Sequence, residues 1–315
     1  MNNHLNSSAR PPLSVEGVAA VMVLFHPDLS LLGEVLAAIA GQVGHLILVD
    51  NTPGHNEARV NQEYIQARLG SITYLPLGDN FGIARGQNVG MNQATSAGFE
   101  HVLLLDQDSI VPNGMVAELL RVEQSMLESA IQVGALGPWF QDKKSGVIAN
   151  AITHGRFFVT RNPFPLDSDS PVRADYLIAS GSLIRTRVLA EVGLNQEDLF
   201  IDWVDVEWCL RASTFGYSHY LTPTIMMQHD IGDRVIKLFG RTICLHNDVR
   251  NYYIIRNACH LLMSPIIYRR WRINILLKIP LWVILFSVTS KTKFRALLLM
   301  LRACFDGLTR RMGRL

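Results

Sequence analysis

The stretch HVLLLDQDS, residues 101–109, places two carboxylates directly after a continuous apolar run. Residues 102–105 are all apolar, which is typical of a strand buried on both faces of a sheet. Asp106 and Asp108 follow one residue apart, and in an extended segment such side chains point the same way. The pair could therefore face one divalent cation, because Mg2+ and Mn2+ prefer oxygen ligands. A solvated turn after a strand is the alternative for this pair taken alone.

Apolar runs of the same kind recur along the first half of the chain and alternate with segments of helical spacing. These runs are residues 17–28, 45–54, 72–80 and 133–140. The alternation predicts an α/β fold with a mostly parallel central sheet covered by helices on both faces. Ligands of such sheets bind beyond the carboxyl ends of the strands. Asp50, residues 78–90 and the Asp106–Asp108 pair all fall at such ends, which predicts one nucleotide-sized cleft.

The segment DNFGIARGQNVG, residues 79–90, combines glycines with Asn80, Arg85 and Asn88 at the start of a predicted helix. Glycines let the backbone approach a ligand closely, and a helix N-terminus favours anions. The segment has neither the GK[ST] of a P-loop nor a GxGxxG fingerprint. An ordinary loop and helix start is the alternative.

A second acidic segment, LFIDWVDVEWCLRA at residues 199–212, carries Asp202, Asp205 and Glu207 among aromatic side chains. Desolvation beside the tryptophans would raise the pKa of a carboxyl group there and make it a candidate general base towards a hydroxyl. The alternative is an acidic first turn that complements the helix dipole.

The later part of the chain adds basic candidates. His229 could ligate a metal, although a lone histidine is more often structural. Arg250 and Arg256 could clamp phosphate oxygens, or could be solvated arginines on an amphipathic helix.

Composition divides the chain into three parts. Residues 1–16 lack an apolar run, so they are not a signal peptide and are expected to form a disordered lead-in. Residues 17–264 form the predicted α/β domain. Residues 265–315 hold 11 of the 29 Lys and Arg residues but only one of the 27 acidic residues, Asp306. Because apolar segments such as IPLWVILFSVTS separate those charges, we expect an amphipathic helical segment on an anionic lipid surface rather than on nucleic acid. Packing on the α/β domain or on a second subunit is the alternative.

The four cysteines lie far apart and form no CxxC pair. A zinc site or a disulfide framework is therefore not expected, and reduced thiols in a cytoplasmic setting fit best.

Taken in order, the segments DNFGIARGQNVG, LLLDQDS, SGSLIR, IDWVDVEWCLR, HDIGD and RNYYIIRN resemble the family 2 glycosyltransferases of GT-A fold. More narrowly, they are similar to the bacterial rhamnosyltransferases of O-antigen and surface polysaccharide synthesis. The resemblance covers residues 17–262.

This resemblance implies a role for each motif residue. Asp50 would bind the base or ribose of the nucleotide, with Asn80, Arg85 and Asn88 nearby. The metal, Mg2+ or Mn2+, would be held by Asp106, Asp108 and His229. Asp205 would be the general base, and Arg250 and Arg256 would contact a diphosphate or a lipid phosphate. Val204 stands where the family has a glutamate, which leaves Asp202 or Glu207 open as alternatives for the base.

The implied reaction is an inverting transfer of L-rhamnose from dTDP-L-rhamnose to a glycan on a polyprenyl diphosphate, at the cytoplasmic face of the bacterial inner membrane, with peripheral attachment. A family 2 enzyme that uses another UDP-, GDP- or dTDP-sugar is one alternative, and a nucleotidyltransferase is another. A nucleotidyltransferase usually has a basic, glycine-rich loop after its first strand, whereas this chain has LFHPDLS there. The acceptor sugar, the linkage and the oligomeric state are left open by the sequence.

Overall fold

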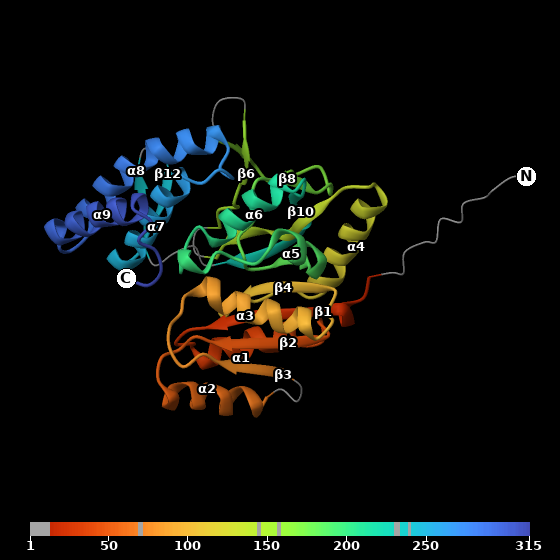
Figure 1. Cartoon of the computed structure of the whole chain (residues 1–315). Coiled ribbons are helices and arrows are strands. Elements are labelled where there is room, and N and C mark those ends of the chain that lie inside the picture. The colour runs from red at the N-terminus through yellow and green to blue at the C-terminus, as the bar shows by residue number, and fades with distance from the viewer. Residues whose placement is uncertain (1–12, 69–71, 144–145, 156–158, 230–233, 239–240) are drawn as a thin grey trace, which may run out of the picture.

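A computed structural model describes residues 13–68, 72–143, 146–155, 159–229, 234–238 and 241–315, with the backbone alone at 229 and over 234–244 (Figure 1). Most of the predicted lead-in lies outside these residues. Its end does not match the prediction of disorder, because Val15–Gly17 form a short 3-10 helix whose N-cap is Ser14.

The first half of the chain alternates strands and helices as the apolar runs predict. Its elements are β1 (Val18–Leu24), α1 (Leu29–Ile39), β2 (His45–Asp50), α2 (His55–Gln66), β3 (Ile72–Pro76), α3 (Ile83–Ser96), β4 (His101–Asp106), α4 (Met115–Glu128) and β5 (Val133–Asp142). Every residue of β1 is buried, which explains why its sequence is apolar throughout.

The second half adds shorter strands and three long helices. Its elements are β6 (Ala151–His154), β7 (Val159–Asn162), β8 (Val172–Ala174), β9 (Ser182–Arg185), α5 (Thr186–Val192), α6 (Val204–Thr214), β10 (Ser218–His229), β11 (Arg234–Leu238), β12 (Arg241–Leu245), α7 (Asp248–Leu262), α8 (Arg269–Thr289) and α9 (Lys293–Leu308). The last two confirm that residues 265–315 are largely helical.

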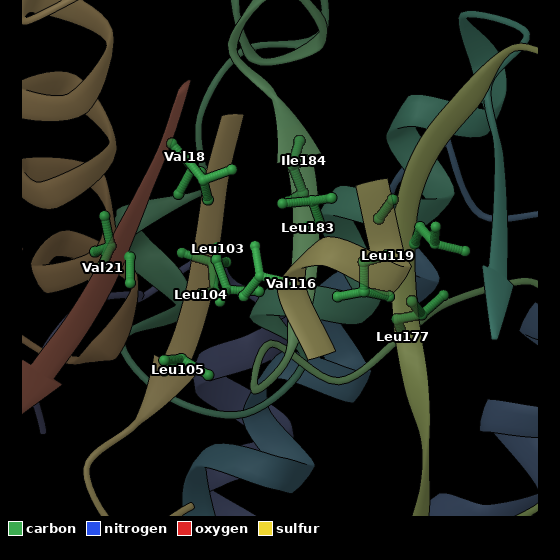
Figure 2. Close-up of a cluster of buried hydrophobic side chains, with 14 of the residues drawn as sticks. Val18, Val21, Leu103, Leu104, Leu105, Val116, Leu119, Leu177, Leu183 and Ile184 are labelled. Carbon is green, nitrogen blue, oxygen red and sulfur yellow. The ribbon is translucent and has the colours of Figure 1, made fainter. Parts of the chain in front are cut away.

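One eight-stranded sheet, in the order β3-β2-β1-β4-β9-β5-β10-β8, organises the molecule. The pairs β3–β2, β2–β1, β1–β4 and β5–β10 are parallel, whereas β9 runs antiparallel to β4 and β5. The sheet is therefore mostly parallel, as predicted. Figure 2 shows side chains of β1, β4, β9 and α4 packed together with Leu177. Burial of each such Val, Leu or Ile contributes about 1.5–3 kcal/mol.

Helix α3 lies unusually close to β1, and its glycines explain why. A Cβ atom at Gly86 would come within 2.7 Å of Val23, and one at Gly90 within 2.2 Å of Val21. The sequence favoured a ligand-approach role for the glycines of this segment. The structure instead shows that Gly86 and Gly90 permit close packing of the helix against the sheet.

Helices α7, α8 and α9 form a separate apolar cluster beside the sheet, near the C-terminus in Figure 1. Trp271, Ile275 and Phe286 of α8 are buried in it, as are Met300 and Ala303 of α9. A Cβ at Gly307 would come within 2.2 Å of the Arg256 carbonyl oxygen, so α9 and α7 are in close backbone contact there. This cluster touches the sheet domain through the loop that precedes α6, since Phe200 stacks on Tyr253 with ring centroids 4.9 Å apart.

Candidate active site at the carboxyl edge of the sheet

The two aspartates after β4 flank an anchored glutamine. Gln107 accepts a hydrogen bond from the backbone N–H of Phe25 (2.8 Å) and donates one to the carbonyl of the same residue (3.1 Å). The backbone N–H of Asp106 donates to the Ser180 hydroxyl at 3.2 Å. The end of β4 is thus tied to the end of β1 and to residue 180. Asp106 is partly buried, whereas Asp108 is exposed.

Asp205 lies in the first turn of α6, close enough to the end of β4 for the two carboxylates to interact. Burial, the largest cause, raises the pKa of Asp205 to about 6. The negative charges of Asp202 and Asp106 contribute to this increase, and the Val206 backbone N–H, which donates at 2.8 Å, opposes it. A carboxyl group with such a pKa can be ionised near neutral pH and still accept a proton, as a general base must.

The loop that carries Asp205 into this position is strained. Phe200, Asp202 and Trp203 all have φ between 61° and 66°, a region that residues other than glycine seldom adopt. Each such residue costs on the order of 1–3 kcal/mol, and such strain persists only when surrounding contacts hold it. No sequence pattern indicated this strain.

Helix α7 supplies those contacts. The Asn257 amide donates to the carbonyls of Leu199 (2.9 Å), Ile201 (2.8 Å) and Asp202 (2.9 Å). Trp203 Nε1–H donates to the Ile254 carbonyl at 3.1 Å. Asn257 is fully buried, so its amide has no solvent to compete for it. The RNYYIIRN stretch therefore fixes the backbone before the candidate base.

The two arginines of that stretch make contacts other than the predicted phosphate contacts. Arg256 is buried, and its guanidinium donates to the carbonyls of Asp198 (3.1 Å) and Leu199 (2.9 Å), to that of Gly313 and to Asn257 Oδ1. A phosphate contact by Arg256 is incompatible with that burial. Arg250 is half-exposed and pairs with Asp202 at 3.2 Å. In this structure it orders the acidic loop.

Some of the predicted nucleotide-binding residues near the ends of β2 and β3 are buried, and others are exposed. Asp50 is fully buried and accepts hydrogen bonds from Tyr74 Oη (2.5 Å), Asn61 Nδ2 (2.8 Å) and the Thr52 N–H (2.8 Å). A direct contact between Asp50 and a nucleotide would require one of these donors to move.

The neighbouring asparagines shape the loop before α3. Asn51 accepts from the Phe81 N–H at 2.8 Å and donates to Asn80 Oδ1 at 3.1 Å; Asn80 Oδ1 also accepts from the Gly82 N–H at 3.0 Å. Asn88 is buried and bonds Asn195 and Glu197, so it supports the next loop. Arg85 is exposed, with its guanidinium 4.5 Å above the Phe81 ring, and is free to reach solvent on that side.

The structure describes the side chains of two of the three predicted metal ligands. Asp106 and Asp108 stand at the carboxyl end of β4, and His229 ends β10, but the His229 side chain lies outside the described residues. Within the described residues no group of three or more His, Cys, Asp or Glu side chains could hold a metal ion. Two carboxylates with the diphosphate oxygens of a ligand do fit the oxygen preference of Mg2+ and Mn2+. The residues present therefore suit a metal that a nucleotide helps to hold.

Three residues with clear contacts at this site had no local signal in the sequence: Gln107, Ser180 and Asn257. Each acts on backbone atoms from a distant part of the chain. Their hydrogen-bonding groups were visible in the sequence, but their partners are between 55 and 82 residues away: Phe25 for Gln107, Asp106 for Ser180 and Asp202 for Asn257.

Comparison with solved structures shows the fold. The crystal structure of GalNAc-T7 with UDP, GalNAc and Mn2+ aligns with a TM-score of 0.56 at 14% identity, over 87% of this chain and 57% of that one. The chain thus spans little more than half of GalNAc-T7. Residues 1–349 of TarS from S. aureus align with a TM-score of 0.54 at 13% identity, over 93% of this chain and 81% of that one. Both confirm the predicted GT-A arrangement of the sheet.

Sequence comparison shows the family. The model of glycosyl transferase family 2 matches residues 20–133, which include most of β1, all of β2 to β4 and the Asp106–Asp108 pair. The dTDP-rhamnosyl transferase RfbF of Shigella flexneri is 31% identical over 251 residues, or 78% of this chain and 79% of that protein. Since this relationship extends through both acidic segments at the edge of the sheet, the chain belongs to glycosyltransferase family 2 and is an enzyme that transfers a sugar from a nucleotide-sugar donor.

Proposed function

We propose that the enzyme transfers L-rhamnose from dTDP-L-rhamnose to a hydroxyl group of a lipid-linked glycan, in the synthesis of O-antigen or a similar surface polysaccharide. The donor is proposed from the relative that is described as a dTDP-rhamnosyl transferase. The observation that carries the reaction type is the position of Asp205, a carboxylate whose pKa of about 6 is raised by burial and by the charge of Asp106.

In the proposed reaction, Asp205 takes the proton of the acceptor hydroxyl as its oxygen attacks the anomeric carbon of the donor. The new C–O bond forms on the face opposite the nucleotide, and the bond from the anomeric carbon to the diphosphate oxygen breaks. Both electrons of that bond leave with dTDP, so the configuration inverts, as in inverting glycoside hydrolysis with a sugar hydroxyl in place of water. An α-linked rhamnosyl product follows.

A divalent metal would be held by Asp106 and Asp108 together with the diphosphate. When bound, such a cation neutralises negative charge that develops on the leaving group. Arg85 is the exposed cation closest in sequence to the loop at residues 79–82 and would contact the same phosphates. Gln107 would keep the two aspartates in register through its hydrogen bonds to Phe25.

The test is release of dTDP from dTDP-L-rhamnose with Mg2+ and a membrane lipid extract, with EDTA and Asp108→Ala as comparisons. Release that requires both the metal and Asp108 supports the proposal. Release of UDP or GDP from a UDP- or GDP-sugar, without release of dTDP from dTDP-L-rhamnose, would agree with the family and contradict the proposed donor. Release of rhamnose 1-phosphate in place of dTDP would indicate nucleotidyl transfer instead.

The lipid-linked acceptor is proposed from the outer face of α8 and α9, which we name the α8–α9 face. It exposes the large apolar residues Leu276, Leu277, Leu281, Ile284, Val288, Phe294, Leu298, Leu301, Phe305 and Leu308. Exposed basic residues surround it, among them Arg269, Arg270, Lys291, Lys293, Arg295 and Arg310. An apolar surface of this extent marks an interaction site, and the cations favour anionic lipid headgroups.

Among the described helices, α8 is the one long and apolar enough to cross a membrane by length and composition. Its other side, however, packs against α7 and α9 through Trp271, Ile275 and Phe286. We therefore propose that α8 lies on the cytoplasmic surface of the bacterial inner membrane, with only its outer side in lipid.

Sedimentation with vesicles tests this attachment. Wild-type protein is expected to bind phosphatidylglycerol-containing vesicles and to bind phosphatidylcholine vesicles far less. The double variant Leu281→Glu, Phe294→Glu should stay in the supernatant, whereas the control Leu166→Glu, which alters an exposed leucine in the loop between β7 and β8, should bind normally. Equal binding by all three proteins, or a wild-type dimer that the double variant dissociates, would show that a second subunit covers this face.

A further inference from the structure

The side chains of His154 and Asp175 form a pair that none of the roles above uses. Asp175 is buried, and its Oδ1 lies 2.8 Å from Nδ1 of His154. Its Oδ2 accepts a hydrogen bond from Nε1–H of Trp271 at 2.7 Å. Both oxygens of Asp175 are therefore engaged, and the plane of the carboxylate is fixed. The His154 side chain is 32% exposed.

This pair sits where the sheet domain meets α8. In Figure 1, β6, which ends at His154, lies beside α8. Tyr268, the residue before α8, has its ring 5.2 Å from that of His154, and Trp271 is in the first turn of α8. Trp271 also packs edge-on against Tyr176, with centroids 5.8 Å apart. Aromatic rings thus lie on two sides of the pair, and sites that bind small organic ligands are lined mostly by apolar and aromatic side chains with a few polar groups.

A short segment connects the pair to the catalytic carboxylates. It begins at Asp175 and ends at Ser180, whose hydroxyl accepts from the Asp106 N–H. Between them, Leu177 and Ala179 line the same cavity as Asp205. Burial, as the largest cause, and then the charge of Asp205 raise the pKa of Tyr176 to about 12, with a smaller contribution from Asp175. The segment from Asp175 to Ser180 therefore joins the residue that holds His154 to the residue that holds the end of β4.

We propose that His154, oriented by Asp175, is a recognition site for a hydroxyl group of the acceptor saccharide, in a subsite bounded by Tyr268 and open towards α8. Because Nδ1 faces Asp175, Nε2 is the ring atom left to hydrogen-bond a ligand hydroxyl. Within the described part of the chain, Nε2 has no hydrogen-bond partner. The aromatic ring of Tyr268 provides an apolar surface for the C–H face of a sugar.

This inference rests on the proposed transferase function, because the ligand is the acceptor of that reaction. It adds that the enzyme recognises a hydroxyl group of the acceptor other than the one that reacts. It also places that hydroxyl group beside the start of α8, since Tyr268 and Trp271 contact the pair.

The first test uses a panel of p-nitrophenyl glycosides of rhamnose, glucose, galactose and N-acetylglucosamine as acceptors. The measured quantity is the ratio of transfer to donor hydrolysis, with KM for the best acceptor. His154→Ala is expected to lower the ratio and raise that KM about tenfold, the effect of one lost hydrogen bond. His154→Gln, which places an amide near the position of Nε2, should restore part of the ratio, and Asp175→Asn should give an intermediate loss. His55→Ala, an exposed histidine at the start of α2, is the matched control.

A ratio of transfer to donor hydrolysis in His154→Ala that equals the wild-type ratio would overturn the inference. An equal loss of transfer and hydrolysis would also overturn it, because it indicates a purely structural role. Absence of any donor turnover by the wild-type enzyme would contradict the proposed function instead. Saturation-transfer-difference NMR with the same glycosides and dTDP measures binding without turnover. Sugar signals that are present with wild type and His55→Ala but lost with His154→Ala support the inference. Signals that are absent with wild type, or unchanged in His154→Ala, contradict it.

Discussion

The amide of Asn257 donates to the carbonyl of Asp202 at 2.9 Å, and this contact joins α7 to the strained loop before the candidate base. The same amide reaches the carbonyls of Leu199 and Ile201. One buried side chain therefore determines the path of four residues that enter α6. The geometry of Asp205 depends on a helix that begins more than 40 residues later in the chain.

We expect Asn257→Ala to lower kcat by roughly tenfold or more and the free energy of unfolding by about 1–3 kcal/mol, since it leaves buried carbonyls without a donor. Steady-state kinetics and urea denaturation measure the two effects. Asn92→Ala, at an exposed position on α3, is the control and should change neither quantity. A variant that unfolds more easily but keeps wild-type kcat would show that Asp205 does not depend on this contact.

The raised pKa of Asp205 predicts how the rate of the reaction depends on pH. Because burial and neighbouring charges raise its pKa to about 6, the carboxylate is mostly protonated below that pH and cannot accept a proton. We expect kcat/KM to rise tenfold per pH unit below pH 6 and to level off above it. Activity measured from pH 4.5 to 8.5 checks this, and Asp205→Asn should be nearly inactive throughout. A profile that stays flat across pH 6 would assign the base to another residue, with Asp202 and Glu207 as the candidates.

The same raised pKa predicts a cost in stability. The folded protein holds the Asp205 proton up to about pH 6, whereas the unfolded chain releases it near the ordinary aspartate pKa of 3.8, so stability falls as the pH rises between these values. Above pH 6 the full cost remains. With solvent screening taken into account, we expect Asp205→Asn to be on the order of 1 kcal/mol more stable than wild type at pH 8.

Calorimetry in EDTA measures that difference, and the gain should shrink as the pH falls and vanish near pH 4. An Asp205→Asn variant that is less stable than wild type at pH 8 would show that the carboxylate contributes contacts that outweigh its desolvation. Such a gain is the usual sign of an active site that sacrifices stability for function.

The fold was predictable because its signals are local. The continuous apolar runs of β1, β2 and β4 reflect burial on both faces, and the acidic pair after β4 marks the carboxyl end of a strand. The glycines of α3 show where this reasoning stops. Glycine at positions 86 and 90 fits either a ligand or a neighbouring strand, and only the 2.2 Å approach to Val21 identifies the strand as the reason.

The site was predictable only in part, for the same reason. A polar residue at a strand end looks alike in sequence whether it faces a ligand or another part of the chain. Asp50 and Asn88 face Tyr74, Asn61 and Asn195, which are between 11 and 107 residues away. Tryptophans beside the carboxylates indicated desolvation within the segment that holds Asp202, Asp205 and Glu207, and the family resemblance then selected Asp205. The strain of its loop depends on α7 and had no such signal.

Arg256 gives the last prediction, because its burial separates a structural role from a phosphate contact. Its guanidinium lies 4.8 Å above the Tyr253 ring and donates to the carbonyls of Asp198 and Leu199. Lysine keeps the charge but cannot reproduce this planar set of donors. We expect Arg256→Lys to lower the free energy of unfolding by about 1–3 kcal/mol and to leave KM for the donor unchanged. Arg85→Lys, at an exposed position, should raise KM for the donor and leave the free energy of unfolding unchanged. If Arg256→Lys instead increases KM for the donor and has normal stability, the result would support the phosphate contact that the sequence predicted.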